Sequence, residues 1–86
     1  MTVHFSKSFL QKIAKLKKRN SKQFAILITQ IDLFQQNQRH PSLKLHKLRG
    51  QRSHQYAIWI QKNLRALCVK HNDTYIFIDL VTHDQY

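Results

Sequence analysis

The chain begins with a short alternating segment and then takes on a helical pattern. In "TVHFS", Val3 and Phe5 flank His4, which predicts a short strand. Ser8, with Gln11 three residues later, has the form of a capping box that opens a helix. The apolar face of this helix is formed by Phe9, Ile13 and Leu16, and its basic surface by Lys12, Lys15, Lys17, Lys18 and Arg19. The helix should therefore be basic on its solvent side.

A second amphipathic helix is predicted from the "RNSK" break to about Gln36. Asn20 and Ser21 are capping residues, and Gln23 follows Asn20 at capping-box spacing. Apolar residues then recur at steps of three and four, namely Phe24, Leu27, Ile28, Ile31 and Phe34. Two consecutive helices joined by a short polar break form a helical hairpin.

After the only proline, Pro41, the pattern changes from helical to alternating. Because a residue before proline is pushed out of the α region, the helical half should end before His40. Four strands are expected, over "LKLHKL", "YAIWI", "RALCV" and "TYIFIDLV". The last is nearly continuous in apolar residues, as in a strand covered on both faces. The only glycine, Gly50, should form the turn after the first of these strands.

The links between these four strands are too short for helical crossovers, so the strands should be antiparallel neighbours. The predicted fold class is α+β: a short N-terminal strand, a two-helix hairpin, and a four-strand antiparallel meander with the helices packed on one sheet face. No repeat or linker divides residues 1–86, which are expected to form one domain. A ligand would then lie on the sheet face that the helices leave free.

The charge balance indicates a polyanionic partner. The 86 residues include 15 Lys and Arg against four acidic residues, a formal net charge of +11. Such a surface should bind nucleic acid at least non-specifically, by neutralising phosphates. The alternatives are solubility alone, or masking by an acidic protein. Because magnesium-dependent nucleases need clustered carboxylates, and those here are scattered, any phosphodiester chemistry should need no metal.

Other residue types argue against several kinds of site. The single cysteine, Cys68, cannot form an intramolecular disulfide, and its apolar strand predicts a buried small hydrophobe rather than a nucleophile. His40, His46 and His54 match no zinc-binding spacing, and we expect neither a metal nor a cofactor. No apolar run approaches the roughly 20 residues needed to span a bilayer, and the first residues lack a signal-peptide pattern. We therefore expect no membrane association and a cytoplasmic location.

Candidate functional residues fall in three places. The segment from Arg39 to His54 is basic and lacks acids, although a solvated edge strand protected by lysines would look the same. Arg65, at the head of a strand, needs a carboxylate or a phosphate, and a structural salt bridge to Asp79 or Asp84 is the alternative to a ligand. The end of the chain, "THDQY", could be a site or merely a polar terminus.

These features together resemble the RelE/ParE superfamily of bacterial toxin–antitoxin toxins, within it the mRNA interferases. The resemblance covers nearly the whole chain and rests on the "HKLRG" turn, the strand-head arginine and the C-terminal histidine and aromatic residue. It implies an endoribonuclease that cuts mRNA in the ribosomal A site. It also implies a tightly bound cognate antitoxin, which should carry an acidic or amphipathic helical segment to meet this basic surface.

The resemblance also implies site residues. The candidate catalytic residues are His46, Arg65, His83 and Tyr86, and the candidate RNA-binding residues are Lys44, Lys47, Arg49 and Arg52. The C-terminal spacing departs from the family pattern, because Tyr86 comes three residues after His83. YoeB-like members have the aromatic residue immediately next, and YafQ-like members have it four residues on. Asp84 has no assigned role.

The residue types suit metal-free RNA cleavage. The RNA's own 2′-hydroxyl can attack the adjacent phosphate if a base, an acid and a cation assist. We assign His46 as base, His83 as acid, Arg65 as phosphate stabiliser and Tyr86 as a stacking or orienting group, and the two histidines could be exchanged. Two alternatives stay open: a ParE-like inhibitor of DNA gyrase, and a non-catalytic RNA-binding domain of the same fold.

Overall fold

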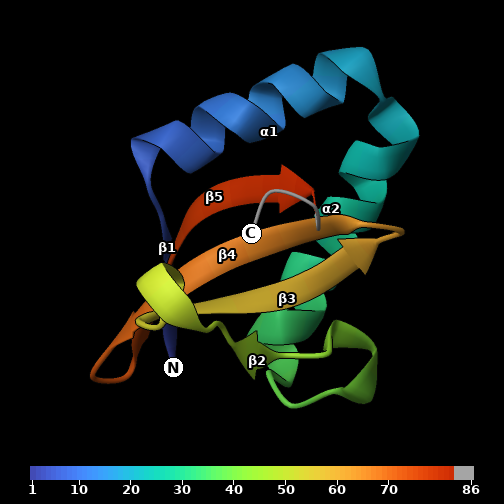
Figure 1. The fold of residues 1–86 in the computed structure, drawn as a ribbon. Coiled ribbons are helices and arrows are strands. Elements are labelled where there is room, and N and C mark those ends of the chain that lie inside the picture. The colour runs from blue at the N-terminus through green and yellow to red at the C-terminus, as the bar shows by residue number, and fades with distance from the viewer. Residues whose placement is uncertain (83–86) are drawn as a thin grey trace.

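The computed structural model describes residues 1–82 (Figure 1). The elements in chain order are β1 (Thr2–Phe5), α1 (Lys7–Arg19), α2 (Ser21–Gln36), the 3₁₀ helix η1 (Pro41–Leu43), β2 (His46–Lys47), the 3₁₀ helix η2 (Gly50–Arg52), β3 (Gln55–Gln61), β4 (Leu64–His71) and β5 (Thr74–Thr82). Within these residues the strands form one sheet in the order β1-β5-β4-β3-β2. β2 to β5 make the predicted antiparallel meander, and β1 adds to it parallel to β5. The predicted α+β fold class is confirmed.

The helical hairpin covers one face of the sheet, with α1 against β5 and α2 against β3. The core between them contains Phe9, Leu16, Leu27, Ile31 and Phe34 from the helices and Ile58, Ile60, Ala66, Cys68, Tyr75 and Phe77 from the strands. The ring of Phe34 meets Tyr75 and Phe77 edge-on, with centroids 5.0 and 5.4 Å away. Each such aromatic pair contributes about 0.5–1.5 kcal/mol beyond the burial of its area. The main core of the described residues therefore lies between the helices and one face of the sheet.

The opposite face of the sheet, hereafter the open face, carries no α-helix among the described residues. Its apolar side chains are Leu48, Ala57, Leu67, Val81 and Ile78. The strand alternation predicted for β3 and β4 is confirmed, since Ala57 and Leu67 lie on this face while Ile58 and Ala66 lie in the core. This is the face on which the sequence predicted a ligand.

The predicted capping box at Ser8 is wrong. The cap of helix α1 lies two residues earlier, at Ser6, whose Oγ accepts a hydrogen bond from the Phe9 backbone N–H at 3.1 Å. The Ser6 N–H is itself held by the carbonyl of Phe77 at 2.9 Å, so pairing with the sheet sets where the helix starts. Ser8 lies inside the first turn, where its hydroxyl donates to the carbonyl of Ile78. The predicted cap of α2 is confirmed, since the Asn20 side chain accepts from the backbone of the third helical residue.

The predicted strand over "LKLHKL" is largely wrong as well. Its start lies in η1, and Lys44 then takes a left-handed conformation with φ 49°. Pairing with β3 covers only His46 and Lys47. The apolar Leu43 is fully buried in the helix-side core, so its hydrophobicity reflects a loop anchor rather than a strand face. A two-residue edge strand leaves few free backbone groups for unwanted pairing.

Two further expectations concern burial and membranes. Cys68 is fully buried, and this burial raises the pKa of its thiol to about 12, which confirms a small core hydrophobe rather than a nucleophile. Within the part of the chain that the structure describes, no helix is long and apolar enough to cross a lipid bilayer.

Candidate functional site

His46 lies on the open face with its ring orientation fixed. It pairs with Ala57, whose side chain is on that face, and it is exposed. Its Nδ1 lies 2.9 Å from the carbonyl oxygen of Lys44. Because a carbonyl only accepts hydrogen bonds, Nδ1 must carry the proton, and in the neutral ring Nε2 then keeps a free lone pair. The backbone therefore presents His46 in the tautomer that a general base with Nε2 as acceptor requires.

The Lys44 carbonyl is aimed at His46 by an unusual turn. Lys44 donates its backbone N–H to Pro41 O at 3.2 Å and adopts the left-handed conformation, which costs a non-glycine residue about 1–2 kcal/mol. Its side chain reaches toward β3, where Nζ lies 5.0 Å from the centroid of the Trp59 ring. Strain of this kind collects where a precise local arrangement is required.

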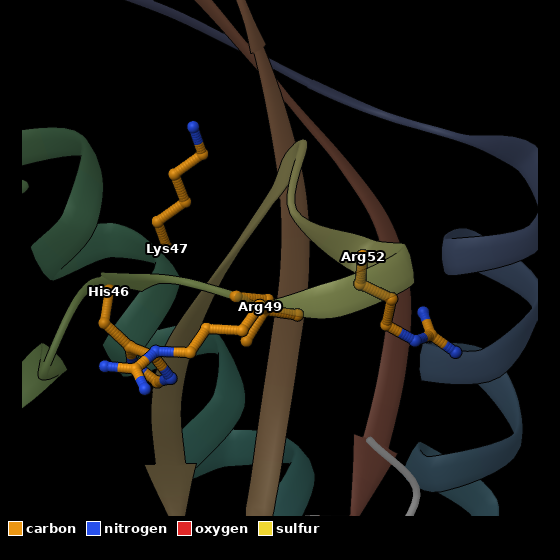
Figure 2. Close-up of a pocket in the computed structure, with 5 residues that line it drawn as sticks. His46, Lys47, Arg49 and Arg52 are labelled. Atoms are coloured by element: carbon orange, nitrogen blue, oxygen red, sulfur yellow. The ribbon is translucent and has the colours of Figure 1, made fainter.

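A basic cavity of about 300 Å³ lies beside His46. It is lined by His46, Lys47, Leu48, Arg49 and Arg52. In Figure 2 the side chains of His46 and Arg49 lie on the same side of the chain, whereas the side chain of Lys47 points to the opposite side. Arg52 is held by a hydrogen bond of 3.2 Å from Nη1 to Gln55 Oε1. With no acidic residue in its lining, this cavity suits an anion.

Arg65 also lies on the open face, opposite Trp59 on β3 and Val81 on β5. Its Nη1 donates to the carbonyl oxygens of Lys62 at 2.9 Å and Leu64 at 3.2 Å. Within residues 1–82 no carboxylate pairs with this guanidinium. Carbonyl dipoles hold its position without neutralising its charge, so the cation stays available for a phosphate.

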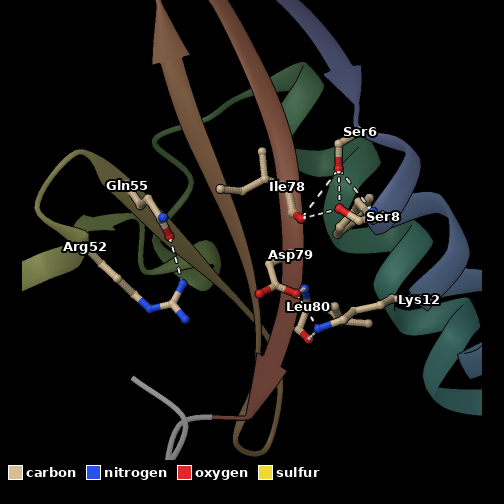
Figure 3. Close-up of polar contacts among 9 residues, drawn as sticks. Ser6, Ser8, Lys12, Arg52, Gln55, Ile78, Asp79 and Leu80 are labelled. Carbon is tan, nitrogen blue, oxygen red and sulfur yellow. Dashed lines mark hydrogen bonds and ion pairs between the residues drawn. The ribbon is translucent and has the colours of Figure 1, made fainter.

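The alternative of a salt bridge from Arg65 to Asp79 is wrong. Figure 3 shows Asp79 turned toward α1, where its Oδ1 pairs with Lys12 Nζ. Lys12 Nζ also donates to Leu80 O at 3.4 Å, and Ser8 Oγ to Ile78 O at 3.2 Å. Since β1 covers β5 only as far as Phe77, these α1 side chains satisfy the carbonyls of the remaining β5 edge. Asp79 is therefore used in docking the helix.

The structure brings His46 and Arg65 to one face without bringing them into contact. Their strands are separated by β3, and the pairs His46–Ala57 and Trp59–Arg65 are two residues apart along it. Two strand spacings and this offset put their Cα atoms roughly 12 Å apart. The surface between them is occupied by Trp59, which the sequence had marked only as an alternating strand residue.

Three residues of the C-terminal segment, His83, Asp84 and Tyr86, lie outside the described residues. The last described residue, Thr82, pairs with Leu64, the neighbour of Arg65. Among residues 1–82, no three of the metal-ligating types His, Cys, Asp and Glu lie close enough to share an ion.

A second cleft, of about 320 Å³, lies between α1 and the end of the sheet. Its apolar lining is Leu64, Leu80 and Val81, its basic lining is Lys12, Lys15 and Arg19, and Thr82 completes it. Sequence reasoning found the basic helix face but not this cleft, because the cleft exists only where α1 passes over β4 and β5. Apolar and cationic side chains together suit an amphipathic, acidic protein segment.

Comparison with known proteins agrees with this architecture. The family model of the ParE-like toxin domain matches residues 28–86, more than half of the chain. No curated protein sequence matches. Among solved structures, the YoeB/ParE toxin from Agrobacterium tumefaciens superposes with a TM-score of 0.76 at 12% identity, covering 96% of this chain and 99% of that one.

Two other solved structures are similar to the same extent. YafQ from E. coli strain BL21(DE3) has a TM-score of 0.76 at 16% identity, over 96% of this chain and 93% of that one. The YoeB–YefM complex from Staphylococcus aureus has a TM-score of 0.75 at 14% identity, over 96% of this chain and 97% of that one. At such identities these structures establish a shared fold alone. The family model covers more than half of the chain and therefore shows that this chain belongs to the ParE-like toxin domain family.

Proposed function

We propose that this toxin-family protein is an endoribonuclease that cleaves mRNA in the ribosomal A site by metal-free attack of the 2′-hydroxyl. The observation that carries the proposal is the pair of groups on the open face. One is Arg65, which has no carboxylate partner within residues 1–82. The other is His46, which is held with Nε2 free by the Lys44 carbonyl.

The proposed reaction is an in-line transesterification. Nε2 of His46 takes the 2′-hydroxyl proton, and the oxygen attacks the adjacent phosphorus. The bond from phosphorus to the 5′-oxygen breaks, and His83 donates a proton to that leaving oxygen. The products are a 2′,3′-cyclic phosphate and a free 5′-hydroxyl, and the exchanged assignment of the two histidines gives the same products.

Arg65 and the basic neighbours act on the phosphates. A guanidinium can hold two non-bridging oxygens at once and stabilise the charge that develops on them. Electrostatic stabilisation of this kind lowers the free energy of the transition state by several kcal/mol. Lys44, Arg49 and Arg52 would hold the flanking backbone, and Lys47 would act from the other side of β2. Tyr86 would stack on or orient a base.

The proposed partner besides mRNA and the ribosome is a cognate antitoxin. The similar YoeB of Staphylococcus aureus is in complex with YefM. In this chain the cleft over Leu64, Leu80 and Val81, flanked by the α1 cations, suits an acidic or amphipathic helical segment of such a protein.

A gyrase inhibitor is the second candidate, because the matching family model is named ParE-like. Such a protein would block a topoisomerase without cutting RNA, and a non-catalytic RNA-binding domain would bind polyanions without cutting them. Fold similarity does not separate these functions, since each depends on the site.

The test is primer extension on mRNA from cells after induction of the wild type and of the Arg65→Ala and His83→Ala variants. We expect codon-phased cuts that both substitutions reduce by at least about 100-fold. The matched control is Lys22→Ala, an exposed cation on α2 outside both the open face and the lining of the α1 cleft, which should cut normally. If induction damages DNA and leaves mRNA intact, the protein inhibits gyrase and the endoribonuclease proposal is wrong. Full cutting by Arg65→Ala would remove Arg65 from the mechanism.

A further inference from the structure

We infer that Trp59, between Lys44 and Arg65, forms a stacking site for one unpaired base of a single-stranded RNA on the open face. The inference rests on the proposed function in one respect, that RNA enters this face. It adds a binding residue that neither the sequence motifs nor the family resemblance assigns.

The indole is held by its edge at the β3–β4 turn. Trp59 Nε1 donates to the carbonyl of Lys62 at 2.8 Å. The same carbonyl accepts from Arg65 Nη1 at 2.9 Å, so one oxygen positions the ring and the guanidinium side by side. Lys62 is left-handed, with φ 52°, and this turn conformation directs the carbonyl toward both donors. The aromatic plane is therefore fixed before any ligand arrives.

The position of Trp59 is unusual for a structural tryptophan. It is only partly buried, and it belongs to neither of the apolar clusters that stabilise the described residues. Its hydrogen bond could serve only to fasten the hairpin, but that role does not require an indole facing outward between two cations. Lys44 Nζ lies 5.0 Å from the ring centroid, and Arg65 is its cross-strand partner.

The chemistry of the three side chains matches one kind of ligand. An indole offers a flat apolar surface on which a nucleobase can stack, and the ammonium and guanidinium groups bind phosphates. A nucleotide carries both a base and a phosphate, whereas a phosphate alone would make no contact with the indole. Bases in a duplex are stacked on each other, so the ligand is a single strand with an accessible base. Within the proposed function, this base flanks the cleaved phosphate held by Arg65.

The experiment uses Trp59 as its own reporter, because it is the only tryptophan in the sequence. The full chain is titrated with a short single-stranded RNA whose 2′-hydroxyls are methylated, so that it cannot be cut. A matched abasic strand carries the same phosphates without bases. We expect the base-containing strand to quench Trp59 fluorescence to saturation, and the abasic strand to bind without comparable quenching.

Variants then separate stacking from packing, with affinities measured by anisotropy of the labelled strand. Trp59→Ala should weaken binding of the base-containing strand by roughly 5- to 100-fold and leave abasic binding within about twofold. Trp59→Phe should retain part of the difference. Circular dichroism checks that each variant is folded. Loss of both affinities by Trp59→Ala, with both affinities retained by Trp59→Phe, would indicate a packing defect and overturn the stacking site.

Failure of the inference and failure of the proposed function give different results. No quenching, together with equal affinity of Trp59→Ala and wild type for the base-containing strand, overturns the stacking site even if mRNA is cut normally. Quenching and a selective affinity loss, in a protein that cuts no mRNA, support the stacking site and remove the nuclease proposal.

Discussion

At the scale of single residues, two backbone carbonyls organise the open face. The Lys44 carbonyl fixes the tautomer of His46, and the Lys62 carbonyl fixes both Trp59 and Arg65. Both carbonyls belong to left-handed residues. His46 and Arg65 were candidates from the sequence, whereas Trp59 was not. The two carbonyls were not predictable either, because neither lysine is a glycine or an asparagine, the residues that signal a positive φ.

Cys68 offers a test of burial at the same scale. Because burial raises the pKa of its thiol to about 12, from an ordinary value of 9.0, the thiol stays protonated in the native state at neutral pH. We expect alkylation by iodoacetamide, followed by mass spectrometry, to be slower by at least about 100-fold in native than in urea-unfolded protein. Since only the unfolded state ionises between these two values, the free energy of unfolding should fall as pH rises above about 9. Fast alkylation of the native protein would contradict this burial.

At the scale of elements, the sequence predicted the helices and the last three strands well. Their apolar periodicity is long and matches the core that they build. The errors fall where tertiary contacts override local signals. Ser6 replaces Ser8 as the cap because the β1–β5 pairing holds Ser6, and a buried Leu43 made a 3₁₀ turn resemble a strand. The site shows the same division: the open face was predicted from strand alternation, and the α1 cleft was not.

The cleft between α1 and the end of the sheet gives a prediction at this scale. A synthetic helical peptide with Leu on one face and Glu on the other should bind there, and its affinity can be measured by fluorescence anisotropy. Lys15→Glu should weaken binding by roughly 5-fold or more, because it places a like charge beside the acidic face. The control is Lys70→Glu, an exposed lysine on β4 outside the cleft lining, which changes the net charge equally. Equal weakening by both variants would show attraction by overall charge alone.

At the scale of the whole molecule, the net charge and the position of the helices have different roles. A formal charge of +11 attracts a polyanion over the entire surface. The helices stabilise the sheet from one face, and the other face is left for His46, Trp59 and Arg65. Of the three described carboxylates, Asp73 pairs with the N-terminal amine and Asp79 with Lys12, and Asp32 lies on α2, away from the open face. The open-face cations therefore keep their charge for a ligand.

The most direct test of the central claim is cleavage of a ribosome-bound mRNA that carries a single 2′-deoxy nucleotide at the cleaved position. We predict that the wild-type protein cuts the all-ribose message to a 2′,3′-cyclic phosphate, and that removing this one hydroxyl abolishes the cut while ribosome binding persists. His46→Ala should slow cutting of the all-ribose message by about 10²–10⁴-fold, and His54→Ala, another exposed histidine, should not. Cleavage of the deoxy-substituted message at the same position and rate would contradict the mechanism.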